Sequence, residues 1–195
     1  MREVELKAVL DSWSERRAKL VQGGASLAFA GRLEDRRYDT GDRSLLARDV
    51  VLRLRIYRDA RGARTELELK GPTGYAGGYK VREEVGTTVS DPEAIESILS
   101  GLGYTVLRAI DREIEQFEVA GTMIRFERYP RMDDLVEVEG EPEAIERAIA
   151  LLGIPRSAFT AERLPDFAAR FESRTGQRAA LCDADLTAPS SSLGS

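Results

Sequence analysis

The opening stretch MREVELKAVL, residues 1–10, alternates charged and aliphatic side chains. Glu3, Glu5 and Lys7 occupy odd positions, and aliphatic residues fill the even positions between them. In a β-strand, successive side chains point to opposite faces, so the two carboxylates and the ammonium share one face. The stretch therefore predicts a strand with one charged face and one apolar face.

The same alternation returns along the chain. Further strands are predicted at residues 25–40, 50–57, 65–70, 80–85, 104–119, 122–129 and 133–140. Their charged faces carry the acids Glu3, Glu5, Glu66, Glu68, Glu84, Glu127, Glu137 and Glu139 and the bases Lys7, Arg53, Arg55, Lys70, Lys80, Arg82, Arg112 and Arg125. The glycine-rich stretch 71–78 predicts a mobile loop.

Helices are predicted from Asp11 or Ser12 to about residue 21, from 91 to 102, from 141 to 152 and from 162 to 174. The sequence DPEAIE at 91–96 returns as EPEAIE at 141–146, which suggests a pseudo-duplicated α+β unit. The length indicates a single domain, placed at residues 1–178. The segment 179–195 ends in a low-complexity stretch and is expected to be a disordered tail.

The composition excludes several functional classes. The formal net charge is −5, so the surface as a whole should not attract nucleic acid or anionic membranes. The absence of histidine excludes histidine-based catalysis and ordinary zinc sites, so any metal would be a hard cation on carboxylates. No apolar run is long enough to cross a bilayer, the N-terminus does not resemble a signal peptide, and Cys182 is the only cysteine. A cytoplasmic protein is expected.

The charged strand faces allow two interpretations. In the first, a twisted antiparallel sheet has one solvated face, on which cross-strand ion pairs contribute little. In the second, the sheet closes into a barrel with its charges inside. Burying so many charges is costly unless a ligand compensates them. A polyphosphate with divalent cations would do so, because Arg and Lys neutralise phosphate oxygens while paired carboxylates hold the cation.

Several of these residues together resemble the CYTH domain, the family of triphosphate tunnel metalloenzymes. The similarity rests on Glu-x-Glu-x-Lys at residues 3–7, Tyr-Asp-Thr at 38–40, Arg-x-Arg at 53–55, Lys70, Arg-x-Glu at 82–84, Arg112 and Glu-x-Glu at 137–139. It covers residues 2 to about 153. The resemblance implies an α+β fold, an eight-stranded antiparallel β-barrel with a charged interior, flanked by helices.

The resemblance also implies roles for individual residues. Metal binding by Mg²⁺ or Mn²⁺ is expected at Glu3, Glu5, Glu127, Glu137 and Glu139. The triphosphate is expected to contact Lys7, Arg53, Arg55, Lys70, Lys80, Arg82, Arg112 and Arg125. Glu3, Glu5 and Lys7 are the expected catalytic residues. The chain departs from the family where Ile110 replaces a frequent basic residue, for which Arg108 or Arg125 could substitute.

Three functions fit these residues. A class IV adenylyl cyclase-like enzyme would convert ATP to cyclic AMP and pyrophosphate, and this branch is the most similar one. A hydrolase of inorganic triphosphate, thiamine triphosphate or a nucleotide would use the same tunnel. A triphosphate-binding module without turnover is the third possibility, although two carboxylate pairs exceed what simple anion binding needs. Relatives of the cyclase branch suggest a homodimer.

Overall fold

The computed structural model describes residues 2–187, and for Arg2 and Glu3 it describes the backbone alone. Within this range the strands are β1 (Arg2–Val9), β2 (Ser26–Thr40), β3 (Val51–Asp59), β4 (Gly62–Lys70), β5 (Gly74–Ala76), β6 (Tyr79–Val89), β7 (Tyr104–Val119), β8 (Thr122–Arg128) and β9 (Leu135–Glu139). The α-helices are α1 (Trp13–Gln22), α2 (Ser44–Ala47), α3 (Pro92–Gly101), α4 (Pro142–Leu152), α5 (Leu164–Thr175) and α6 (Ala184–Thr187), and a 3-10 turn spans Arg156–Ala158.

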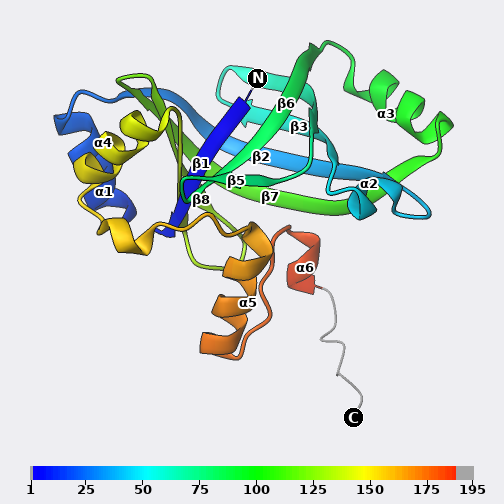
Figure 1. The fold of residues 1–195 in the computed structure, drawn as a ribbon. Helices are drawn as coiled ribbons and strands as arrows, with labels where there is room; N and C mark the ends of the chain where they lie inside the picture. The colour runs from blue at the N-terminus through cyan, green and yellow to red at the C-terminus, as the bar shows by residue number, and fades with distance from the viewer. Residues whose placement is uncertain (1, 188–195) are drawn as a thin grey trace.

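The strands close into an antiparallel barrel (Figure 1). The sheet order is β1-β9-β8-β7-β2-β3-β4-β6, and a pairing between β1 and β6 completes the ring. The short β5 pairs with β6 outside this ring, within the stretch predicted as a loop. The predicted eight-stranded barrel is therefore confirmed, with one additional strand.

Closure of the barrel sends the charged faces inward and the aliphatic faces outward. Leu6 and Ala8 of β1 are buried against an outer layer that contains α1 and α4, where Trp13 meets Phe126 edge-to-face at 5.4 Å between ring centroids. On the other side, Leu99 of α3 packs on Leu54 of β3. The main apolar cores thus lie between the barrel and its helices.

Two smaller apolar clusters lie apart from these outer cores. One joins Leu33, Tyr57 and Ile114 from β2, β3 and β7. In the other, Leu164 and Phe167 of α5 pack with Ile110, Tyr129 and Leu135. Ile110 thus belongs to the contact between α5 and the barrel, which explains why an apolar side chain suits this position.

The chain after the predicted domain boundary at residue 178 continues to contact the barrel. Ala180 pairs with Arg131 in an isolated antiparallel bridge, and the backbone nitrogen of Asp111 donates to the carbonyl oxygen of Leu181 at 2.8 Å. Cys182 is buried. Contacts with the barrel therefore continue into the segment predicted as a tail, whose last residues, 188–195, lie outside the described part. Among the described helices, none has the length and apolar character needed to cross a membrane.

We predict that Phe126→Ala lowers the free energy of unfolding by about 3–5 kcal/mol, because it removes a fully buried ring from the outer core. Urea denaturation measures this change. Val85→Ala is the matched control, since Val85 is 72% exposed, and it should change stability by less than about 0.5 kcal/mol. Similar losses in both variants would contradict the assignment of the main core to the outside of the barrel.

Candidate active site

A cavity of about 200 Å³ lies inside the barrel and is partly open to solvent. Its lining contains ten basic and four acidic residues, an excess of six formal positive charges in a protein of net charge −5. The basic residues are Lys7, Arg37, Arg53, Arg55, Lys70, Lys80, Arg82, Arg108, Arg112 and Arg163, and the acids are Glu5, Asp49, Glu127 and Glu137. Such a concentration of positive charge around one cavity favours an anionic ligand.

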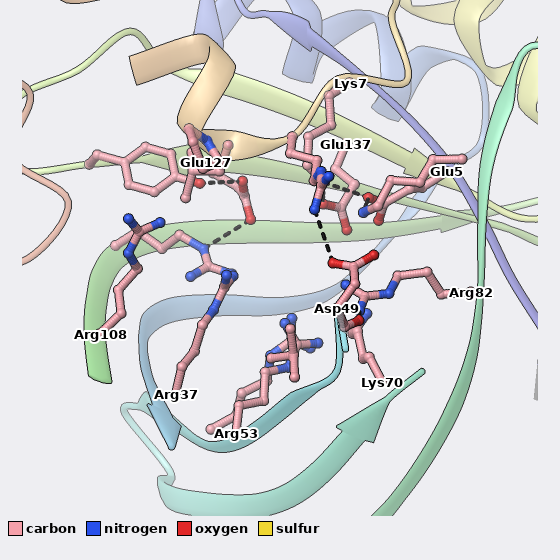
Figure 2. A pocket seen from close by; sticks show the side chains of 18 of the residues that line it. Glu5, Lys7, Arg37, Asp49, Arg53, Lys70, Arg82, Arg108, Glu127 and Glu137 are labelled. Carbon is pink, nitrogen blue, oxygen red and sulfur yellow. Dashed lines mark hydrogen bonds and ion pairs between the residues drawn. The ribbon is translucent and has the colours of Figure 1, made fainter. Parts of the chain in front are cut away.

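The charges are unevenly distributed around the cavity (Figure 2): Glu5, Glu127 and Glu137 gather with Lys7 on one side, and Arg37, Arg53 and Lys70 lie opposite them. Glu5, Glu137 and Glu127 come from the neighbouring strands β1, β9 and β8. Across the cavity, Arg53 and Lys70 belong to β3 and β4. We call these the acidic wall and the basic wall. An elongated anion between the two walls would contact the arginine and lysine side chains of the basic wall. On its other side it would face the glutamates of the acidic wall, which can bind a cation.

Lys7 lies at the centre of the acidic wall. Its ammonium group donates to a carboxylate oxygen of Glu137 and contacts Glu5 at 3.3 Å. Lys80 of β6 also donates to Glu5. Burial alone would raise the pKa of Glu5, but the nearby Lys7, Lys80 and Lys70 hold it well below its ordinary value. Glu5 is therefore a carboxylate at neutral pH.

The second acid of this wall, Glu127, is held by two neighbours. Its carboxylate accepts from Arg112 Nε at 2.9 Å and from the hydroxyl group of Tyr129 at 2.7 Å. Burial opposes its ionisation, yet Arg112, Lys7 and Arg125 lower the pKa of Glu127 to about 2. Burial and the adjacent Glu127 raise the pKa of Tyr129 well above its ordinary value. Glu127 thus stays ionised, and Tyr129 stays protonated.

The basic wall is braced by acids behind it. Arg53 Nε donates to Glu68 at 2.6 Å, and Arg55 Nη1 lies 3.3 Å from the same carboxylate. Asp35, which is fully buried, lies 3.4 Å from Arg53 and 3.7 Å from Arg55. Burial would raise the pKa of Glu68, but Arg55 and Arg53 lower it to about 2. These contacts fix the guanidinium groups before any ligand arrives.

Several guanidinium nitrogens in the wall have no hydrogen-bond acceptor among the described residues. They are Nε of Arg37, Nε of Arg55 and Nη1 of Arg112, all buried atoms of residues that line the cavity. Buried donors without acceptors are unusual in folded proteins and costly. Nε of Arg37 and Nε of Arg55 each lie 3.7 Å from the carboxylate of Asp35, so their charge is compensated within the wall.

The lining also contains Leu46 and Asp49 from the region of α2, and Arg163, Leu164 and Pro165 at the start of α5. This side of the cavity is here called the mouth. The Asp49 carboxylate accepts from Arg163 Nη1 at 3.0 Å and from the backbone nitrogen of Thr73 at 2.7 Å. Arg82 donates to the carbonyl oxygen of Asp49 at 2.6 Å and to that of Gly71 at 2.7 Å. Arg82 thereby joins two loops at the mouth.

The structure brings most of the predicted site residues to the cavity. Those that line it are Glu5, Lys7, Arg53, Arg55, Lys70, Lys80, Arg82, Arg112, Glu127 and Glu137. Arg125 is buried beside the cavity and donates to Glu137 at 3.0 Å, whereas Glu139 is half-buried outside the lining. Glu3 lies on β1 opposite Arg82, and its side chain is outside the described part.

Sequence reasoning missed Arg37, Tyr129, Asp49 and Arg163 as lining residues. Two of them carried a usable signal, because Arg37 lies in a predicted strand and Tyr129 follows Glu127 by two positions on the same face. Asp49 and Arg163 lie next to helices, where strand alternation does not indicate which side chains line the cavity. Of the two substitutes considered for Ile110, Arg108 lines the cavity and Arg125 does not.

The acidic wall has the donor chemistry for a hard divalent cation. Glu5 and Glu137 both contact the single ammonium group of Lys7, so their carboxylates lie close together. Carboxylate oxygens suit Mg²⁺ or Mn²⁺, which often complete their coordination with water and phosphate oxygens. Among the described residues there is no group of three or more acidic, histidine or cysteine residues that could hold a metal alone.

Comparison with protein families identifies the family to which this chain belongs. The model of the CYTH domain matches residues 1–151. The chain belongs to the CYTH domain family. A search of curated proteins found no match. CYTH membership agrees with the barrel and its charged cavity, and it places α5 and the segment after it beyond the matched residues.

Solved structures share the fold at low sequence identity. A Vibrio parahaemolyticus protein named as a candidate adenylate cyclase is 19% identical with a TM-score of 0.73, over 86% of this chain and 97% of that one. A Pyrococcus horikoshii protein is 23% identical with a TM-score of 0.70, over 86% and 98%. HpAC1 from Hippeastrum, a candidate adenylyl cyclase described with a dominant triphosphatase activity, is 18% identical with a TM-score of 0.61, over 92% and 98%.

The low pKa of Glu127 predicts a dependence of stability on pH. Because folding depresses this pKa from 4.5 to about 2, the ionised form stabilises the fold above pH 4.5, and that contribution, of order 3 kcal/mol, is lost as the pH falls towards 2. Glu127→Gln should therefore lower the free energy of unfolding at pH 7 and reduce its change between pH 7 and 3. Urea denaturation at both pH values measures this.

Glu118→Gln, at an exposed position, is the control and should behave like the unmodified protein. An unchanged difference in stability between pH 7 and 3 in Glu127→Gln would contradict the proposed ionisation of Glu127.

Proposed function

We propose that this protein is a divalent-metal-dependent enzyme that binds a triphosphate in the barrel cavity, and that its reaction is the conversion of ATP to cyclic AMP and pyrophosphate. The observation that carries the proposal is the cavity itself, whose lining has an excess of positive charge and sets a basic wall opposite an acidic wall. Phosphoryl transfer depends mainly on positioning and on stabilisation of charge, and this arrangement can supply both.

The basic residues would hold the phosphate chain. Arg53 and Arg55 are fixed by Asp35 and Glu68, so they would bind phosphate oxygens with little loss of side-chain freedom. Lys70 and Arg112 would extend the contacts along the chain. Arginine suits this task because its planar group contacts two oxygens at once.

The acidic wall would hold the cation, with Glu5 and Glu137 as direct ligands and Glu3 as a further proposed ligand. Glu5 and Glu127 are ionised at neutral pH, so each can bind a cation and neither has a proton to donate. The bound cation would polarise the phosphoryl oxygens and lower the pKa of the attacking hydroxyl group. In cyclisation, the ribose 3′ oxygen would bond to the α-phosphorus and release its proton to water. The bond between the α-phosphorus and the α–β bridging oxygen would break, and pyrophosphate would leave.

Hydrolysis is the second candidate function, in which water attacks the terminal phosphorus of a triphosphate. The similarity to the Hippeastrum protein favours it, since that protein is described with a dominant triphosphatase activity. The same cavity and cation would serve both reactions. They differ in the nucleophile and in whether an organic group is bound next to the phosphates.

Product analysis separates the two reactions. The purified protein is supplied with Mg²⁺ or Mn²⁺ and either ATP or inorganic triphosphate. We expect cyclic AMP and pyrophosphate from ATP. Orthophosphate without a cyclic product would indicate the hydrolase, and no product from either compound would contradict an enzymatic role.

Glu5→Gln should lower the rate of turnover by about a hundredfold or more, because it removes a carboxylate ligand for the cation. The measurement is the initial rate at saturating Mg²⁺, with folding checked by circular dichroism. Glu118→Gln neutralises an exposed acid and serves as the control. Full activity in Glu5→Gln would exclude Glu5 as a metal ligand.

Lys70→Met should weaken the binding of inorganic triphosphate by about tenfold, because a buried ammonium group of the basic wall is lost. Isothermal titration calorimetry in EDTA measures the affinity without turnover. Lys19→Met removes the same charge from α1, outside the cavity lining, and should leave the affinity unchanged. Equal effects of the two substitutions would show that the affinity for triphosphate depends only on the overall charge of the protein.

A further inference from the structure

An apolar cluster lies inside the otherwise charged barrel. Leu33, Tyr57 and Ile114 pack together from the neighbouring strands β2, β3 and β7. Their exposed fractions are 0%, 5% and 2%. Each lies an even number of positions along its strand from a residue that lines the barrel cavity, so all three point inward. We call this cluster the plug.

The plug follows the lining residues that lie farthest from the mouth. Along β3 the lining begins at Val51, next to the mouth, and ends at Arg55. Tyr57 is the next inward residue, and its hydroxyl group accepts from Arg55 Nη1 at 3.3 Å. On β7, Ile114 follows the lining residue Arg112 in the same way. None of the three plug residues belongs to the lining, so the cavity ends where the plug begins.

A buried ion pair occupies the barrel interior beside the plug. Arg125 of β8 is 5% exposed and donates to Glu137 at 3.0 Å and to the side-chain oxygen of Gln116 at 3.4 Å. Gln116 follows Ile114 by two positions on β7 and lies opposite Arg125 in the sheet. The plug and Arg125 together therefore fill the interior along the strands β3, β2, β7 and β8.

The plug is also covered on its outer side. The ring of Phe29 meets that of Tyr57 edge-to-face at 5.5 Å between centroids, and the guanidinium group of Arg64 lies 4.4 Å from the centroid of Tyr57. A separate pocket of about 220 Å³ lies at the turn between β3 and β4, and its lining includes Tyr57. Tyr57 therefore stands between this outer pocket and Arg55 of the barrel cavity.

An apolar plug cannot accept part of a charged ligand. A phosphate group placed against Leu33 and Ile114 would leave water without gaining a compensating cation, which is costly. Protein interiors also contain few voids, so an additional group at this end would have to displace a side chain of the plug. A phosphate chain that enters from the mouth would therefore end at Arg55 and Arg112.

We propose that the plug of Leu33, Tyr57 and Ile114 restricts the site to phosphate chains that end in a free terminal phosphate, and that it excludes compounds with an ester on that phosphate. The inference rests on the proposed function and deepens it, because it names a requirement on the substrate that the charged walls do not impose. A channel open at both ends would accept a chain substituted at both ends. A closed one accepts a substituent only on the side of the mouth.

The γ-phenyl ester of ATP tests the proposal, because it carries a ring on the terminal phosphate. We expect its dissociation constant for the unmodified protein to exceed that of ATP by about a hundredfold, and we expect this ratio to fall by about tenfold in Tyr57→Ala, which opens space for a ring. Calorimetry in EDTA measures both affinities. The ester also has one negative charge fewer than ATP, but this difference affects both proteins alike and cancels in the comparison.

Tyr38→Ala is the matched control, because it removes the same side chain from the outer cluster that contains Leu54 and Leu99. It should leave the ratio of the two dissociation constants at the value of the unmodified protein. Leu33→Ala is a second variant of the plug and should also lower the ratio. It keeps the test decisive if Tyr57→Ala does not fold, which circular dichroism checks.

Equal affinities of the unmodified protein for ATP and its ester would overturn the plug proposal and leave the proposed function intact. A ratio that is unchanged in the plug variants, or lowered equally in Tyr38→Ala, would also overturn it. If the unmodified protein bound neither ATP nor inorganic triphosphate, the proposed function would fail together with the inference. The affinity for inorganic triphosphate therefore distinguishes the two failures.

Discussion

The pairing of buried charges inside the barrel is the interaction on which the rest of the structure depends. Asp35 is fully buried between Arg53 and Arg55, and Glu127 is held by Arg112 and Tyr129. A buried charge without a partner costs several kcal/mol, so each of these groups requires the strand that carries its partner. The register of the closed barrel sets Glu5 opposite Lys80, Lys7 opposite Glu137 and Arg53 opposite Glu68, so the same register places these charges around the cavity.

The charged interior forces the apolar cores to the outside. Aliphatic faces on the outer surface of the strands need cover, and helices supply it on two sides. The repeated sequence at 91–96 and 141–146 begins α3 and α4, which cover different parts of the barrel. The two similar segments therefore have the same structural role, because each begins a helix that buries an outer strand face.

The chemistry of the site follows from the separation of charge between the two walls. Glu5 and Glu137 lie on adjacent strands and share Lys7, so two carboxylates lie close together around one ammonium group. The opposite wall keeps its arginines oriented through Asp35 and Glu68. The first wall brings carboxylates together and the second brings guanidinium groups together, so the cavity between them combines groups suited to a cation with groups suited to an anion.

Much of the structure of this protein could be predicted from the strand alternation and the turn residues in its sequence. They predicted the eight barrel strands, the charged faces and most cavity residues, because the direction of a side chain in a strand depends on its position only. The local pattern left open whether the charged faces would meet solvent or one another. It also missed β5 and the contacts of residues 179–187, since a short paired segment and an irregular one carry no periodicity.

Only the tertiary structure decided which charges meet. Lys7 and Glu137 are separated by 130 positions in sequence, and Arg163 and Asp49 by 114. Their contacts depend on closure of the barrel between β1 and β6 and on the docking of α5 at the mouth. Such long-range pairings follow from the sum of packing and electrostatic energies over the whole chain, which no local stretch of sequence contains.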